Sequence, residues 1–269
     1  MQFALNHMVA PKLGYAAFFD LAVALGLKAV EIRNDITTSL MDIASARNIR
    51  AMADERGLEI LTVNALQRFN NWTPARTEEA KDLAAYTAAT GAQALILVPV
   101  NDTAFAPPTA ARLGGLRDAL RGLAPILRDH GLTGLVEPLG FVECSLRLKA
   151  EAIAAIDDVG EAARFQVTHD TFHHFVAGEQ ALFPARTGLI HASGVTDRRQ
   201  SAATMRDPHR VLVDAADLID NADQIKRLLA GGYNGAISLE PFATSVHDDP
   251  QIAQSLKASL DYLRVGGDV

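Results

Sequence analysis

The chain has 269 residues, and 25 Lys and Arg against 32 Asp and Glu give it a formal net charge of −7. Hydrophobic residues make up 49% of it, which is enough for a sizeable core and excludes an intrinsically disordered protein. The acidic balance, without a basic block, argues against electrostatic binding of nucleic acid or of an anionic membrane. We therefore expect neither partner. Length alone allows one domain or two.

The cysteine content and the first thirty residues indicate the cellular compartment of the protein. Cys144 is the single cysteine, so no internal disulfide can form, which fits a reducing environment. The N-terminal residues lack the basic and apolar regions of a signal peptide, and the apolar segment 16–30 is interrupted by Asp20, Gly26 and Lys28. The sequence thus favours a cytoplasmic protein without a membrane partner.

Short apolar runs alternate along the chain with longer segments of helical periodicity. The runs have few charges, as expected of parallel strands that are buried on both faces. The expected strands are 3–5, 29–32, 59–63, 94–98, 133–136, 165–167, 188–190 and 236–239. The expected helices are 15–25, 42–56, 76–90, 109–130, 148–159, 221–230 and 249–264.

Glycines punctuate this pattern, because six of the seven expected helices are followed directly by a glycine, which can adopt positive φ. The glycines concerned are Gly26, Gly57, Gly91, Gly131, Gly160 and the pair Gly231-Gly232. The repeated strand–helix units predict an α/β fold, a single (β/α)₈ TIM barrel over residues 1–269 with a long loop at about 192–220. The alternative is a doubly wound sheet, but no G-x-G-x-x-G motif follows the first run.

Four consecutive strand ends carry metal-binding side chains, namely Glu137, Asp170, His191 and Glu240. In a barrel these positions converge at the carboxyl end, where active sites form. Three buried carboxylates repel one another unless a cation or protons offset them. Oxygen donors with one imidazole suit Mn²⁺ or Mg²⁺, and Co²⁺ or Zn²⁺ also fit. The alternative interpretation is that these acids cap the helices that follow them.

Other polar residues are candidates for the same end of the barrel. His173 follows Asp170 by one helical turn, so both can face one pocket. Glu143 and Arg147 lie in the loop after Glu137, where they either bind substrate hydroxyls or form an exposed ion pair.

The remaining candidates come from the first strands and the long loop. Asn64, together with His7 and Glu31, ends one of the first three strands and is placed to line the pocket floor. Asp207 and His209 form a D-x-H unit with the spacing of a second metal site, although this short motif is a weak signal.

At this point the chain resembles the xylose-isomerase-like TIM-barrel sugar isomerases and epimerases. That superfamily also contains endonuclease IV, hydroxypyruvate isomerase, ketose 3-epimerases and inosose isomerases. The resemblance rests on Glu137-Pro138, Asp170-x-x-His173, His191 and Gly232-Tyr233-x-Gly235 with Ser238-x-Glu240. Leu139-Gly140-Phe141, Asp170-Thr171-Phe172-His173 and Asp207-x-His209-Arg210-Val211 are most similar to inosose (2-keto-myo-inositol) isomerases.

The resemblance implies one divalent metal, most often Mn²⁺, held by Glu137, Asp170, His191 and Glu240. It further implies that Glu137 and Glu240 transfer protons and that His173 and Glu143 bind substrate oxygens. Two features depart from relatives. Asp197 stands where epimerases usually have an arginine, and Asn64 and Pro99 stand near positions where endonuclease IV has metal-binding histidines. The second departure and the acidic charge disfavour nuclease activity.

Together these features predict a metal-dependent isomerase or epimerase of carbohydrate metabolism, with inositol catabolism as the specific pathway. Its small-molecule substrate would be a keto-polyol, an inosose or a ketose, converted by proton transfer through a metal-bound cis-enediolate. An alternative is a metal-dependent dehydratase of the 3-dehydroshikimate dehydratase type, which begins with the same proton abstraction. A third hypothesis is a non-catalytic sugar-binding barrel. A homo-oligomer is compatible with all three.

Overall fold

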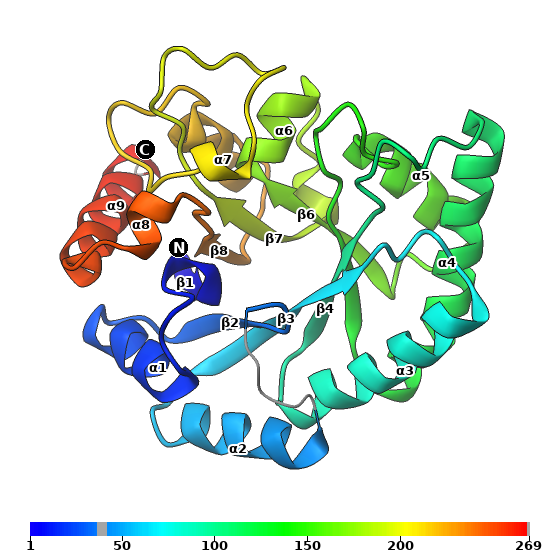
Figure 1. Ribbon diagram of the computed structural model, residues 1–269, viewed down its shortest axis with the longest axis horizontal. Coiled ribbons are helices and arrows are strands. Elements are labelled where there is room, and N and C mark those ends of the chain that lie inside the picture. The colour runs from blue at the N-terminus through cyan, green and yellow to red at the C-terminus, as the bar shows by residue number, and fades with distance from the viewer. Residues whose placement is uncertain (37–41, 268–269) are drawn as a thin grey trace.

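Eight parallel strands close into a barrel in the computed structural model, which describes residues 1–36 and 42–267 (Figure 1). Each strand pairs with its neighbours in chain order, and the first pairs with the last. The strands are β1 (Gln2–Asn6), β2 (Ala29–Arg33), β3 (Glu59–Gln67), β4 (Ala94–Val98), β5 (Thr133–Val136), β6 (Phe165–Asp170), β7 (Thr187–Ala192) and β8 (Ala236–Leu239).

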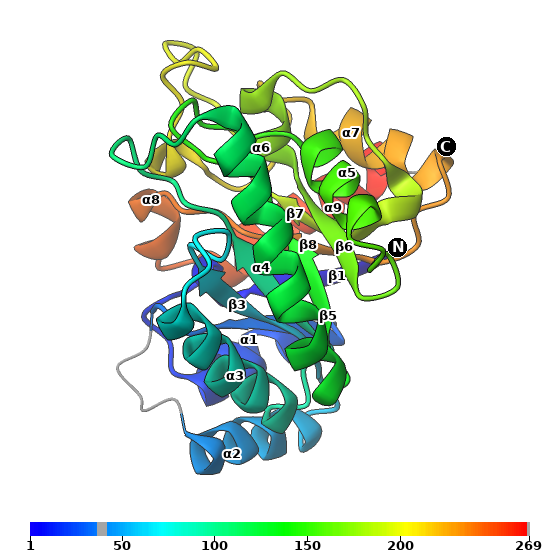
Figure 2. The same ribbon diagram turned by 90° about the vertical axis from the view of Figure 1, so that its right-hand side faces the viewer.

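Helices surround the strands, as Figures 1 and 2 show. They are α1 (Tyr15–Ala24), α2 (Ile43–Asp54), α3 (Pro74–Ala89), α4 (Thr109–Asp129), α5 (Lys149–Asp158), α6 (Thr171–Ala177), α7 (Asn221–Ala230), α8 (Thr244–His247) and α9 (Ile252–Gly267). The predicted TIM barrel is therefore confirmed. No helix among the described residues is long and apolar enough to cross a membrane.

The local signals explain most of the element boundaries. Gly26 and Gly131, at the ends of α1 and α4, have φ of 71° and 68°, and φ is also positive at Gly57, Gly91, Gly160 and Gly232. The short helices α6 and α8 were not among the expected helices. They span 7 and 4 residues, which is too short for apolar periodicity to identify them.

Alternation along β4 separates two apolar clusters. Leu95 and Leu97 belong to the larger cluster, which includes side chains of the surrounding helices. Ile96 and Val98 belong to a smaller cluster with residues of neighbouring strands. Because successive side chains of a strand point to opposite faces, the first pair packs outward and the second fills the barrel interior.

Strand register brings polar residues side by side at one end of the barrel. Asn6 pairs with Glu31 between β1 and β2, and Asp170 pairs with His191 between β6 and β7. The long loop predicted after the seventh strand is also present, since residues 193–220 separate β7 from α7. It holds the short 3-10 helix Asp207–His209, and in Figure 2 the loop, drawn in yellow, extends beyond the helices.

Candidate metal centre and active site

The four candidate ligands lie together at the carboxyl ends of four consecutive strands. Asp170 is the last residue of β6 and His191 lies in β7, whereas Glu137 and Glu240 follow β5 and β8 directly. One donor atom from each residue lies within 4.8 Å of the other three, and all four residues are buried. Among the described residues no other group of three or more such side chains has this arrangement.

The ligand atoms face one another closely. His191 Nδ1 lies 2.6 Å from Glu137 Oε1 and 3.3 Å from Glu240 Oε2. Besides belonging to this cluster, Asp170 caps α6, because its Oδ1 accepts a hydrogen bond from the His173 backbone N–H at 2.9 Å. The helix-cap interpretation is thus correct for one oxygen of Asp170, while the other oxygen accepts a hydrogen bond from Arg210.

Two buried arginines stabilise the carboxylates. Arg210 donates through Nη2 to Asp170 Oδ2 at 2.7 Å and to Glu240 Oε2 at 3.0 Å. Arg33 donates through Nη1 to Glu240 Oε1 at 2.7 Å, and it also pairs with Asp35. Both guanidinium groups lie near the ring of Phe242, at 4.4 Å for Arg210 and 5.5 Å for Arg33.

A fourth buried carboxylate lies behind His191. Glu31 Oε2 is 3.2 Å from His191 Nε2, on the opposite side of the imidazole from Glu137 and Glu240. Thr62 Oγ1 donates to the same carboxylate oxygen at 2.6 Å. Asn6 Nδ2 lies within hydrogen-bond distance of both Glu31 and Glu240, at 3.3 and 3.2 Å. The ligand cluster is therefore held from two sides.

The charges of this buried group predict what it binds. Four carboxylates (Glu31, Glu137, Asp170, Glu240) and two guanidiniums (Arg33, Arg210) are all at most 4% exposed, so with neutral His191 they sum to −2. Buried charge is costly unless it is offset. One divalent cation brings the sum to zero, and three carboxylate oxygens with one imidazole nitrogen are suitable ligands for such an ion. The residues therefore fit a single divalent metal.

The pKa values of the group show how strongly its charges interact. Burial raises the pKa of Glu240 to about 7, and the charge of Glu137 adds to this effect. Burial opposes the charged form of Asp170 as well, but Arg210 and the neighbouring histidines lower its pKa to about 2. For His191, burial is outweighed by Glu240, Glu31 and Glu137, which raise its pKa well above the ordinary value.

A cavity of about 410 Å³ opens directly onto the cluster. Of the four candidate ligands only Glu137 and Glu240 line it, whereas Asp170 and His191 lie behind them. The predicted substrate-binding residues His173 and Asn64 are also in its wall. Asn64 Nδ2 lies 3.4 Å from Glu240 Oε1. The rest of the lining is Arg33, Asp35, Gln67, Arg68, Val98, Pro99, Asn101, Leu139, Asp207, Arg210 and Phe242.

Family comparison identifies the barrel. A family model described as xylose isomerase-like TIM barrel matches residues 19–264. The chain belongs to this family. A xylose isomerase domain-containing protein from Salmonella typhimurium LT2 is 32% identical and covers 98% of this chain and 97% of its own, with a TM-score of 0.87. No curated protein matches the chain in sequence.

Two more distant structures share the fold of the xylose isomerase-like barrel. The IolI protein, whose structure contains a bound zinc atom, is 18% identical with a TM-score of 0.87, and the match covers 99% of this chain and 98% of IolI. D-psicose 3-epimerase from Clostridium cellulolyticum H10, solved with D-tagatose, is 17% identical with a TM-score of 0.78 and covers both chains completely.

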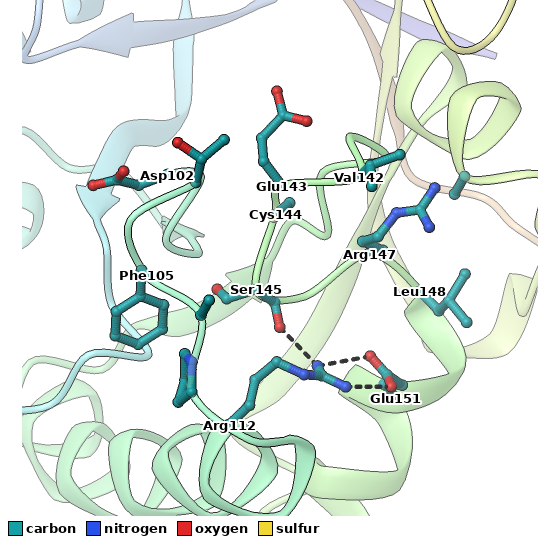
Figure 3. Close-up of a pocket in the computed structure, with 14 residues that line it drawn as sticks. Asp102, Phe105, Arg112, Val142, Glu143, Cys144, Ser145, Arg147, Leu148 and Glu151 are labelled. Carbon is teal, nitrogen blue, oxygen red and sulfur yellow. Dashed lines mark hydrogen bonds and ion pairs between the residues drawn. The ribbon is translucent and has the colours of Figure 1, made fainter.

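Glu143 and Arg147, predicted to bind substrate, line a different cleft of about 710 Å³ between the β4–α4 and β5–α5 loops (Figure 3). Arg147 donates through Nε and Nη2 to the Gly140 carbonyl at 3.0 and 2.9 Å. Glu143 lies 3.8 Å from Arg206 of the long loop instead of pairing with Arg147. The structure therefore does not bring these two residues into the cavity of the ligand cluster.

The D-x-H unit is divided between two environments. Asp207 lines the cavity and lies 3.3 Å from Arg210 Nη1. His209 Nδ1 accepts a hydrogen bond from the Arg206 backbone N–H at 2.9 Å. Neither residue joins the four-residue cluster, so the second metal site stays a prediction without a third ligand among the described residues.

The sequence did not predict a role in the site for Arg33 or for Arg210. A signal for Arg33 was available, because a charged residue at the carboxyl end of a strand that is buried along its whole length is unusual. For Arg210 the signal was weaker. It lies in a loop, and only the fold brings it to Asp170, 40 positions earlier in the chain.

Proposed function

We propose that this chain is a divalent-metal-dependent isomerase or epimerase of an uncharged keto-polyol, an inosose or a ketose. One observation carries the proposal. Glu137 and Glu240 belong both to the candidate metal cluster and to the cavity wall, while the other two ligands do not reach the cavity. Two carboxylates between cation and substrate can act as the general base and general acid that proton transfer beside a carbonyl requires.

The metal is the one component that the side chains do not supply. A divalent ion held by Glu137, Asp170, His191 and Glu240 supplies Lewis acidity, which polarises a carbonyl and acidifies the neighbouring C–H bond. Mn²⁺ is the first ion to test, because oxygen donors dominate the ligand set. Zn²⁺ is the second, because zinc is the metal bound in the structure of IolI.

The side chains divide the proton transfer between them. Glu240 takes the proton from the carbon next to the carbonyl, which leaves an enediolate. Its orientation is fixed by Arg33 and Asn6, which both donate to Oε1. Glu137 or Glu240 then returns a proton. Delivery to the former carbonyl carbon, with transfer of the hydroxyl proton to the former carbonyl oxygen, isomerises the substrate. Delivery to the opposite face of the original carbon inverts it.

The charges around the cavity favour an uncharged substrate. Each arginine in the described cavity wall already pairs with a carboxylate: Arg33 with Asp35 and Glu240, Arg68 with Asp102, and Arg210 with Asp170 and Glu240. The wall holds four carboxylates and three guanidiniums, so apart from the metal an anionic substrate finds no unpaired cation among its side chains. This supports a neutral keto-polyol over the carboxylate substrate of a 3-dehydroshikimate dehydratase.

The test is a turnover screen of the Mn²⁺-loaded protein in D₂O, followed by NMR and mass spectrometry. The panel contains keto-inositols, ketoses and 3-dehydroshikimate. We expect a neutral substrate to be converted without loss of mass and with deuterium incorporated beside the carbonyl. Loss of water from the acid would show the dehydratase instead. If nothing in the panel is turned over, the sugar-binding alternative gains support.

A further inference from the structure

The imidazole of His191 lies between two sets of carboxylates. Its Nδ1 faces Glu137 and Glu240, whereas its Nε2 faces Glu31 at 3.2 Å. A neutral imidazole carries a proton on one nitrogen only, and the other nitrogen offers the lone pair that a metal needs. The hydrogen-bond partner of the protonated nitrogen therefore decides which nitrogen is left free to bind a metal.

Glu31 is itself held in one orientation. It is fully buried and lies in β2, where strand register places it beside Asn6 of β1. Its Oε2 accepts the hydrogen bond of Thr62 Oγ1, and its Oε1 accepts that of Asn6 Nδ2. The other contact of Oε2 is with His191 Nε2. A carboxylate fixed in this way accepts from an Nε2–H and has no proton to donate.

The arginines of the site do not account for this burial. Arg33, two positions along the same strand, pairs with Asp35 and Glu240, and Arg210 pairs with Asp170, Asp207 and Glu240. Among the described residues, His191 is the one titratable side chain to which Glu31 has an ion-pair contact. A buried carboxylate is costly unless it is hydrogen-bonded and its charge is offset, so the hydrogen bond from His191 Nε2–H is the reason to keep it.

We propose that Glu31 is a positioning residue for the metal centre, which holds His191 as the tautomer with Nε2 protonated and the Nδ1 lone pair directed at the ion. Glu31 thereby also raises the basicity of the ligand and contributes one of the four negative charges that a divalent ion and two arginines balance. The inference rests on the proposed metal-dependent function, and it assigns no contact with substrate to Glu31.

The first measurement is the affinity for Mn²⁺ of the metal-depleted full chain, by isothermal titration calorimetry. Removal of such a carboxylate typically weakens metal binding about 10- to 100-fold. We expect a loss in that range for Glu31→Leu and a smaller loss for Glu31→Gln, whose amide oxygen still accepts from Nε2. Glu59→Gln makes the same chemical change at the exposed first residue of β3 and leaves the affinity unchanged.

The second measurement distinguishes positioning from a merely structural role. Long-range ¹H–¹⁵N spectra of the Zn²⁺-loaded protein, with His191→Gln for assignment, report which ring nitrogen carries the proton. The wild type should show protonated Nε2, and Glu31→Leu should lose this single pattern. If Glu31→Leu fails to fold, Glu31→Gln and Thr62→Val carry the test, because Thr62 orients the carboxylate.

The outcomes separate this inference from the proposed function. If the wild type binds Mn²⁺ and the folded Glu31 variants bind it within about threefold of the wild type, the positioning role is wrong while the metal centre stands. If the wild type binds no divalent ion, the proposed function itself fails. Weakened binding in Glu31→Leu with an altered His191 tautomer supports the inference.

Discussion

Arg33 and Glu240 form a buried ion pair, with Nη1 and Oε1 2.7 Å apart and both side chains at most 5% exposed. They are 207 positions apart in the chain and lie at the ends of β2 and β8. The carboxylate proposed to abstract the substrate proton is thus anchored to an element on the other side of β1. This anchor fixes one oxygen of Glu240 and leaves the second to the metal cluster.

Replacement of the proposed base is the first prediction. Glu240→Gln retains the size of the side chain but cannot accept a proton, so deuterium exchange into the substrate should fall by about 10²- to 10⁴-fold. Exchange is measured by NMR in D₂O at saturating Mn²⁺, with circular dichroism to confirm the fold. Exchange at the wild-type rate would transfer the role of base to Glu137.

The buried ion pair should be essential for stability. Arg33→Met leaves Asp35 without its cation and Glu240 with Arg210 alone, and breaking a buried pair costs about 3–5 kcal/mol. The free energy of unfolding is measured by urea denaturation. Arg121→Met is the matched control, since Arg121 pairs with Asp118 on the surface and should contribute less than about 1 kcal/mol. Equal effects of the two variants would show that the pair does not stabilise the fold.

Metal binding should depend on pH with a definite sign. Burial raises the pKa of Glu240 to about 7, and the surrounding carboxylates raise that of His191 well above its ordinary value, yet only the deprotonated groups bind metal. The Mn²⁺ affinity should therefore fall as the pH is lowered from 8 to 6. Metal binding should release protons, and it should release more of them at pH 6 than at pH 8.

Calorimetry in buffers with different ionisation enthalpies counts these protons directly. An affinity that is constant over this pH range, with no proton release, would contradict the charge balance derived for the site.

Substrate charge gives a further prediction. Apart from the metal, the wall of the cavity carries more carboxylates than guanidiniums, so a ketose should be preferred over the same skeleton with a carboxylate at the end remote from the metal. Placing like charges side by side costs several kcal/mol, and we expect kcat/KM for the acid to be lower by about 100-fold or more. Steady-state kinetics on the two compounds is sufficient. A preference for the acid would favour the dehydratase alternative.

Much of the fold and the ligand cluster could be predicted from the sequence, for a physical reason. Strands buried on both faces appear as uninterrupted apolar runs, so a charged residue directly after one stands out. Glu137 and Glu240 are of this kind, and the barrel places all such positions at the same end. Gly26 and Gly131 marked helix ends because few other residues accept their positive φ.

The directions of side chains in the loops could not be predicted in this way. Glu143 lies six positions after Glu137, but the antiparallel bridge between Asn101 and Cys144 holds this loop against the β4–α4 loop. Glu143 therefore lies at the outer cleft (Figure 3). Arg210 reaches the cluster through the path of a 28-residue loop, numbered 193–220, that no local pattern specifies. Such contacts depend on tertiary packing and therefore needed the structure.

The central claim is that four residues hold one divalent ion at the carboxyl end of the barrel. Equilibrium dialysis of the metal-depleted protein against Mn²⁺, followed by metal analysis, tests it most directly. Asp170→Asn is the informative variant, because Asp170 belongs to the cluster but does not line the cavity. We predict one ion per wild-type chain and strongly weakened binding in the folded variant. No bound ion in the wild type, two ions per chain, or undiminished binding by Asp170→Asn would contradict the account.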